Sequence, residues 1–274
     1  YEDNAHEDAG AVYLIHGPVY GEVELSTAHA KLVGEESDAH AGYSLAPAMD
    51  LDGDGYDDLI VGAPGTDDGG TNAGVAYVLH GPVIAGENSL AIADAKFIGE
   101  ASYDSAGGGV GIAGDQNSDG YVDLLIGAFR QDAGGSQSGA AYLVFGPVSG
   151  ETDLQNADVK FIGEAEEDWA GQVVSSLGDV NADGYPDFAI GALYEDTVGV
   201  DAGAMYVIYG PGDGSDVEID LAEADAKLLG EASGDYAGTT RRIGDLDGDG
   251  YDDVLVSAYL TNHNGSDSGI AYLL

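Results

Sequence analysis

The sequence predicts an all-β fold made of four similar repeats, and two observations support this prediction. A cluster of oxygen-bearing residues begins at Asp50, Asp115, Asp179 and Asp245, with separations of 65, 64 and 66 residues. Short apolar runs flank every cluster, and none of them has helical periodicity. A repeat of this length indicates an array of structural units rather than one or two ordinary domains.

Each repeat divides into four predicted strands, named A to D in chain order, whose short length and β-branched content favour strand over helix. Strand A opens at Ala41, Ala106, Ala170 and Ala237, and strand B contains residues 59–61, 124–126, 188–190 and 254–256. Strand C begins at Ala11, Val75, Ala140, Ala204 and Ile270, and strand D at Ala30, Ala95, Val159 and Ala226. Four short antiparallel strands per repeat predict the blades of a β-propeller, with an open sandwich as the weaker alternative.

Residues 1–274 are therefore interpreted as a single propeller region. It divides into a partial blade (1–36, strands C and D), three complete repeats (37–101, 102–165 and 166–232) and a fourth repeat that ends in strand C (233–274). This makes 17 strands, one more than a closed ring of four blades needs. Two arrangements stay open: an arc of a larger propeller, or a ring that closes with the strand at residues 29–33.

The composition limits the classes of partner. Seven basic residues stand against 51 acidic ones, so the formal net charge is −44. This charge repels nucleic-acid backbones and anionic membranes, and no apolar run is long enough to cross a bilayer. There are no cysteines, which excludes disulfides and thiolate metal sites. The expected partners are cations, neutral surfaces, basic patches or other copies of the chain.

The oxygen-bearing clusters fit calcium, which takes six to eight hard oxygen ligands from closely spaced Asp and Asn side chains. Loop positions one, three, five and nine supply side chains, and position seven supplies a backbone carbonyl. The predicted ligands are Asp50, Asp52, Asp54, Tyr56 and Asp58; Asp115, Asn117, Asp119, Tyr121 and Asp123; Asp179, Asn181, Asp183, Tyr185 and Asp187; and Asp245, Asp247, Asp249, Tyr251 and Asp253. An EF-hand is excluded, because it needs a Glu at position twelve, where each loop here has Val or Ile.

The segment from Ala41, AGYSLAPAMDLDGDGYDDLIVGAP, resembles the FG-GAP repeat of integrin α-subunit propellers and their bacterial relatives. The later copies end in IGAF, IGAL and VSAY, and the leading aromatic-Gly pair of the family is Ala-Gly in every copy. The resemblance implies a calcium-bound propeller of about seven blades, outside the cell or at its surface, with calcium in the hairpin between strands A and B. It also implies adhesion or ligand binding, although no integrin ligand-contact motif is present.

Catalysis has no positive support in the sequence. The string from Gly109 to Gly114 matches GxGxxG but falls in strand A without a following helix, so it does not indicate a dinucleotide site. The six histidines do not share one repeat position that would build a common site, and the acidic residues are too numerous to single out a catalytic pair. We therefore expect no catalytic residues and no enzyme.

Strand D carries four of the seven basic residues at one shared position: Lys31, Lys96, Lys160 and Lys227. We expect this strand to be the outer edge of each blade, where a lysine blocks pairing between edges and meets nearby carboxylates. Trp169, the only tryptophan, precedes Ala170 and is a candidate for a lone exposed aromatic contact.

The preferred functional hypothesis is an extracellular scaffold with four structural calcium ions that binds a protein or glycan ligand on a cell or matrix surface. Three alternatives stay open: a carbohydrate-binding lectin propeller, an accessory propeller of a larger secreted enzyme, and a surface protein that assembles with copies of itself.

Overall fold

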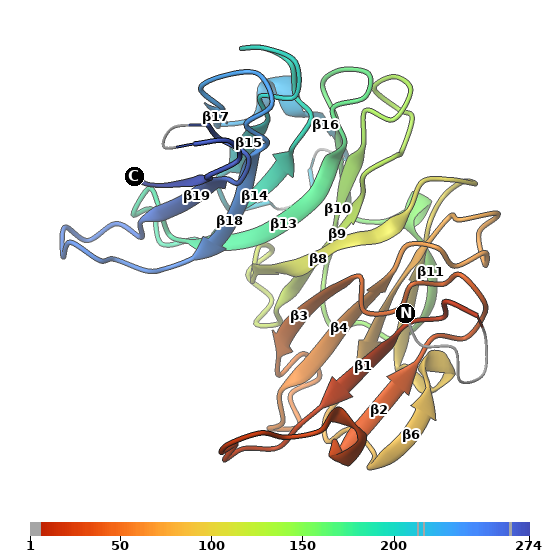
Figure 1. The fold of residues 1–274 in the computed structure, drawn as a ribbon. Coiled ribbons are helices and arrows are strands. Elements are labelled where there is room, and N and C mark those ends of the chain that lie inside the picture. Colours follow the sequence, from red (N-terminus) through yellow and green to blue (C-terminus); the bar gives the residue numbers. More distant parts are fainter. Residues whose placement is uncertain (1–6, 213, 216, 263–264) are drawn as a thin grey trace.

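The computed structural model describes residues 7–212, 214–215, 217–262 and 265–274, so residues 1–6 of the predicted partial blade lie outside the described part. Strands dominate, and the helical structure within that part is four single 3₁₀ turns: η1 (Leu25–Thr27), η2 (Leu90–Ile92), η3 (Leu154–Asn156) and η4 (Leu221–Glu223). Figure 1 shows the sheets following one another along an arc. The predicted all-β fold class is confirmed.

Five sheets account for the described strands, and the repeats follow them in chain order. The first contains β1 (Ala11–Leu14), β2 (Ala30–Val33) and β6 (Gly86–Ser89). The second contains β3 (Ser44–Met49), β4 (Asp58–Ala63), β5 (Val75–Leu79), β7 (Ala95–Ile98) and β11 (Gly150–Asp153). The third contains β8 (Ala106–Gly114), β9 (Asp123–Ala128), β10 (Ala140–Val144), β12 (Val159–Ile162) and β16 (Glu218–Asp220).

The last two sheets lack a fifth strand in the described part of the chain. The fourth contains β13 (Ala170–Gly178), β14 (Asp187–Ala192), β15 (Ala204–Ile208) and β17 (Ala226–Leu229). The fifth contains β18 (Ala237–Arg242), β19 (Val254–Ala258) and β20 (Ile270–Leu273). The strands that correspond to A, B, C and D pair antiparallel in that order, as the sequence predicts.

The expectation that strand D is the outer edge of each blade is wrong for three sheets. A short strand from the following repeat covers β2, β7 and β12 on the outside, and it pairs parallel: β6 on β2, β11 on β7 and β16 on β12. Only β17 lacks such a partner among the described strands. These added strands tie each sheet to its successor, because they belong to the chain that leads to the next strand D.

Neighbouring sheets share their hydrophobic cores. One cluster joins Ile60 and Val78 of the second sheet to Leu124 and Ile126 of the third. A second cluster joins Phe161 and Leu143 of the third sheet to residues of the fourth, including Phe188 and Ile190. The strand-C residues Tyr77, Tyr142 and Tyr206 are fully buried. Burial between sheets, rather than within one repeat, therefore supplies the main apolar stabilisation.

The glycine in strand B allows the next sheet to approach. A Cβ atom on Gly62 would lie 2.0 Å from the carbonyl oxygen of Gly107, and one on Gly127 would lie 1.8 Å from that of Gly171. Both carbonyls belong to strand A of the following repeat. Ser257 takes the corresponding place in the last repeat, where the described residues include no following strand. The glycine is required by a backbone contact between repeats.

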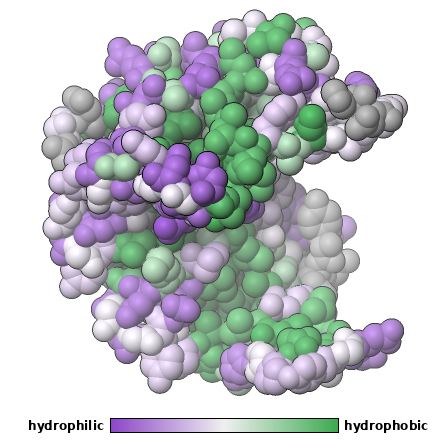
Figure 2. Space-filling view, turned by 90° about the vertical axis from the view of Figure 1, so that its left-hand side faces the viewer, coloured by the Kyte–Doolittle hydropathy of each residue, from purple (hydrophilic) through white to green (hydrophobic). Residues whose placement is uncertain are grey.

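The first strands of the four repeats, β3, β8, β13 and β18, lie side by side and line a hollow. Figure 2 shows hydrophobic residues gathered on this hollowed face. No pairing joins β20 to β2 in the described part of the chain, and Figure 1 places the two end sheets far apart. The described residues therefore form an arc of blades rather than a closed ring.

Candidate metal sites

The four predicted loops occupy equivalent hairpins between strands A and B: β3–β4, β8–β9, β13–β14 and β18–β19. The carboxylate at position one organises each loop. Asp50 Oδ1 accepts hydrogen bonds from the Gly53 and Asp54 N–H groups at 2.8 and 3.0 Å, and its Oδ2 accepts one from Gly55 at 3.0 Å. Such local bonds are the usual way in which an Asp side chain folds a tight loop.

The same pattern recurs in the other loops. Position five donates its N–H to the carboxylates of Asp115, Asp179 and Asp245 at 3.1 to 3.2 Å. The glycine at position six donates to the second oxygen of those carboxylates at 2.9 to 3.0 Å. The carboxylate at position one therefore gives all four loops the same backbone conformation.

Two loops bring three carboxylates together. In the first, oxygens of Asp50, Asp52 and Asp58 lie within 4.8 Å of one another, and in the fourth, oxygens of Asp245, Asp247 and Asp253 do so. The position-five residues Asp54 and Asp249 stand outside these groups, and each accepts the backbone N–H of the following tyrosine, at 2.8 and 3.0 Å. Three of the five predicted ligands thus converge in each of these two loops.

The second and third loops have an asparagine at position three instead of an aspartate. Asn117 Nδ2 donates to Asp119 Oδ2 at 3.0 Å, and Asn181 Nδ2 donates to Asp183 Oδ2 at 2.9 Å. Their amide oxygens accept the N–H of the same aspartates. The asparagine removes one negative charge from the loop and keeps an oxygen available as a ligand.

The position-nine carboxylate has a structural role as well. Asp58 is buried, and its two oxygens accept the N–H groups of Leu51 at 2.7 Å and Gly81 at 2.8 Å. Asp123 and Asp187 are also buried and receive equivalent pairs of bonds. Burial raises the pKa of Asp123 to about 6, although its two backbone donors act in the opposite direction. This aspartate joins the loop to the end of strand C.

Several neighbours of the loops escaped the sequence analysis. His80 Nδ1 lies 3.4 Å from Asp52 Oδ2, so this histidine borders the first loop. Gln116 uses its side-chain amide to bond the carbonyl oxygens of Ala113 and Pro186, which links the second loop to the third. Asp252 accepts the Asp179 N–H at 3.1 Å and links the third loop to the fourth. Gln116 and Asp252 stand inside a predicted loop, whereas His80 follows strand C and has no sequence signal that places it beside the first loop.

The hypothesis that Trp169 makes a lone exposed contact is wrong. Its ring lies 5.4 Å from that of Phe129 and 4.4 Å from that of Tyr194, between centroids. The guanidinium carbon of Arg130 lies 5.2 Å from the centre of the Trp169 ring. Trp169 belongs to a row of aromatic side chains that crosses successive repeats.

The FG-GAP repeat family matches this chain at residues 41–79, 170–208 and 242–274. The second repeat lies outside these matches, although it forms the same hairpin. The chain is 30% identical to integrin alpha-5 of Xenopus laevis over 172 residues, which is 60% of the chain and 16% of that protein. It is 29% identical to integrin alpha pat-2 of Caenorhabditis elegans over 238 residues, 80% of the chain and 18% of that protein.

A third relative is integrin alpha-PS2 of Drosophila melanogaster, 29% identical over 249 residues, 86% of the chain and 16% of that protein. The chain therefore spans less than a fifth of the length of these curated relatives. Among the described residues there is no helix with the length and apolar character needed to cross a membrane.

Proposed function

Because this chain is built from FG-GAP repeats and resembles integrin alpha chains, we propose that it is a calcium-binding propeller scaffold for adhesion or ligand binding, with no catalytic role. It is part of a larger propeller and works outside the cell or at its surface. Its ligand is a protein or a glycan on a cell or matrix surface. The division into repeats at residues 37, 102, 166 and 233 belongs to the same proposal.

One observation supports the calcium sites above all others: the same loop conformation occurs four times, and in the first and fourth loops three carboxylates converge. A structure that only needed tight turns would not require carboxylates at positions one, three and nine within 4.8 Å of one another, as in the first and fourth loops. At neutral pH such groups repel each other unless a cation lies between them. The donor set is all oxygen, which suits calcium rather than zinc or copper.

Each loop would hold one ion with the side chains of positions one, three, five and nine and the carbonyl of position seven. The position-five side chain must turn from its bond with the following tyrosine N–H to join the others. Calcium supplies positive charge that cancels this repulsion. The protein contributes the hairpin that holds the oxygens, and position nine connects that hairpin to strand C of its own sheet.

Calcium outside cells fills sites with dissociation constants of about 10⁻⁴ to 10⁻³ M, which fits the proposed location. The stiffened hairpins then present the loops between strands as a fixed surface for a ligand. The high negative charge favours partners with basic or neutral surfaces.

Calorimetric titration with calcium, together with thermal melting before and after chelation, tests the proposal. We expect about four ions per chain and a melting temperature that falls on chelation. A chain in which Asp50, Asp115, Asp179 and Asp245 are each replaced by Asn serves as the control and should bind weakly. The absence of calcium binding in the unmodified chain would refute the metal sites, and an unchanged melt would refute their stabilising role.

A further inference from the structure

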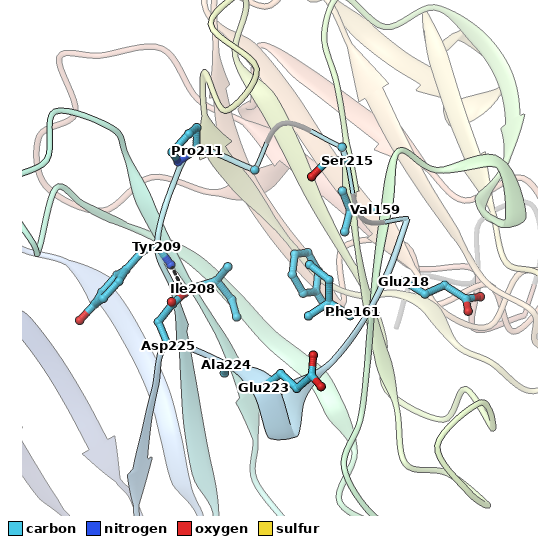
Figure 3. Close-up of a pocket in the computed structure, with 13 residues that line it drawn as sticks. Val159, Phe161, Ile208, Tyr209, Pro211, Ser215, Glu218, Glu223, Ala224 and Asp225 are labelled. Atoms are coloured by element: carbon cyan, nitrogen blue, oxygen red, sulfur yellow. Dashed lines mark hydrogen bonds between the residues drawn. The ribbon is translucent and has the colours of Figure 1, made fainter.

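A cavity of about 400 Å³ lies between β12 and the segment that follows β15. This segment also contacts two hairpin loops, because Gly212 N–H bonds Gln116 and Gly210 N–H bonds Asp187. Figure 3 shows its interior, where Val159 and Phe161 of β12 face Ile208 at the end of β15. Ile219 of β16 and Ala224, just after η4, complete the apolar lining. A comparison of the residue after the Gly-Pro pair in each repeat explains this space.

The cavity exists because one valine is missing. After the Gly-Pro pair that ends strand C, the three earlier copies have Val19, Val83 and Val148, whereas this repeat has Gly212. Val148 is only 8% exposed and belongs to the core cluster that contains Ala95 and Phe97 of β7. Val159 and Phe161 are the counterparts of those two residues one repeat later. With glycine in place of valine, the space above them is left unfilled.

The rim of the cavity is acidic. Its lining contains Glu218, Glu223 and Asp225 and no basic residue. Asp225 Oδ2 accepts the Tyr209 N–H at 2.8 Å, which is the dashed line in Figure 3. In that view the Glu223 carboxylate is turned toward Phe161, whereas Glu218 and the Tyr209 ring point away from the centre. Glu223 is thus the carboxylate best placed to meet a charged group on a molecule in the cavity.

We propose that this cavity binds a small amphiphilic amine, with its apolar body over Val159, Phe161 and Ile208 and its ammonium group at Glu223. An apolar interior with a few well-placed polar groups is the usual form of a small-molecule site. The second carboxylate, Asp225, is held by a backbone donor and adds negative potential without leaving its place. A neutral ligand of the same shape gains the apolar contact and loses the charge interaction, and an anion is repelled.

Phenethylamine is a suitable probe, and 2-phenylethanol is its neutral control. Methyl NMR of isoleucine- and valine-labelled protein at saturating calcium would follow Val159, Ile208 and Ile219. We expect saturable shifts of these methyl groups with the amine, weakening as salt is raised, because the rim charges are exposed to solvent. The alcohol should bind at least ~3-fold more weakly.

Two variants test the location. Gly212→Val restores the valine of the other repeats. A Cβ there would lie 3.2 Å from Leu143 Cδ2 and 3.4 Å from Gln116 Oε1, so these two side chains must shift by a few tenths of an ångström. The variant should reduce amine affinity about 10-fold or more, and its melting temperature reports whether the fold accommodates the valine. Glu223→Gln keeps the shape and should weaken only the amine, roughly 3-fold.

The proposal is overturned if the methyl groups show no saturable shift, if the alcohol binds as tightly as the amine, or if Gly212→Val binds as well as the parent. If Gly212→Val fails to fold, Glu223→Gln tests the proposal instead. Amine affinity equal to that of the parent in Glu223→Gln would show that the Glu223 carboxylate does not bind the ammonium group. The calcium response is measured in parallel, so that failure of the calcium sites and failure of this cavity can be told apart.

Discussion

Lys96 of β7 lies directly opposite Tyr77 of β5, with its ammonium nitrogen 5.3 Å from the centre of the tyrosine ring. The same nitrogen bonds Glu35 Oε1 at 2.7 Å, and Glu35 follows strand β2 of the preceding sheet. Lys160 and Lys227 repeat the arrangement with Glu100 and Glu164. The lysines of strand D meet carboxylates, as the sequence predicts, and these contacts join consecutive sheets.

Replacing Lys160 by Met should destabilise the fold by about 2 kcal/mol, because it leaves the largely buried Glu100 carboxylate without its partner. Denaturant unfolding at saturating calcium measures the change. Lys31→Met is the matched control: the side chain of its partner Glu87 is 58% exposed and stays solvated when the lysine is lost. Lys31→Met should lower the free energy of unfolding by less than half as much as Lys160→Met. Equal losses would show that the ion pair contributes little.

Asp168 should make stability depend on pH. Burial, followed by the negative charge of Glu195, raises the pKa of Asp168 to about 7 in the folded chain, whereas an unfolded Asp titrates near pH 4. The folded state therefore binds the proton more tightly, and its stability falls as pH rises from about 4 to 7. The charged form is the unfavourable one, and its cost is fully present above pH 7.

The variant Asp168→Asn checks this dependence through denaturant unfolding at pH 5 and pH 8 with saturating calcium. At pH 8 we expect the free energy of unfolding of the variant to exceed that of the parent by roughly 1 to 2 kcal/mol. At pH 5 most of this difference should disappear. A parent and a variant with parallel pH profiles would contradict the raised pKa.

Asp58 and Asp52 of the first loop should respond differently to substitution. Asp58→Ala leaves the N–H groups of Leu51 and Gly81 without their acceptor, so it should cost about 2 kcal/mol even in chelator. Asp52→Ala should mainly weaken calcium binding, because the Asp52 carboxylate contacts groups near the loop surface, the Asp54 N–H and the His80 ring. Melting curves with calcium and with chelator separate the two effects. A calcium-dependent loss alone for Asp58→Ala would contradict its structural role.

Gly127→Ala should be severely destabilising, by about 3 kcal/mol or more, because its Cβ would lie 1.8 Å from the Gly171 carbonyl oxygen and would force two sheets apart. Gly234→Ala is the control. It has a φ of +79° and open space around the added Cβ, so it should cost only about 1 kcal/mol. Thermal melting of both variants makes the comparison, and similar losses would argue against the close contact.

Much of the candidate site could be predicted from the sequence, because each loop is local. Asp50 bonds residues three to five positions later, and such contacts follow from spacing alone. The pattern of strands A to D is also local. The assignment of calcium, the four metal sites and the repeat boundaries stay predictions.

The edge strands could not be predicted, since β6, β11 and β16 are short, mostly exposed and polar, as in Gly-Glu-Thr-Asp of β11. Their pairing is with a strand of the preceding repeat, so no local pattern signals it. The placement of Trp169 failed for a similar reason: Phe129 comes from the preceding repeat, and Tyr194 follows strand B of the same repeat, 25 residues later.

The sequence by itself determined the repeat, the strand order and the hairpin loops, because these depend on residues within a few positions of each other. The tertiary structure decided which strand covers which sheet edge, and where the absence of a valine at Gly212 leaves a cavity. Those features depend on contacts between residues some sixty positions apart, such as Lys96 with Glu35, whose partners are chosen by the packing of one sheet on the next.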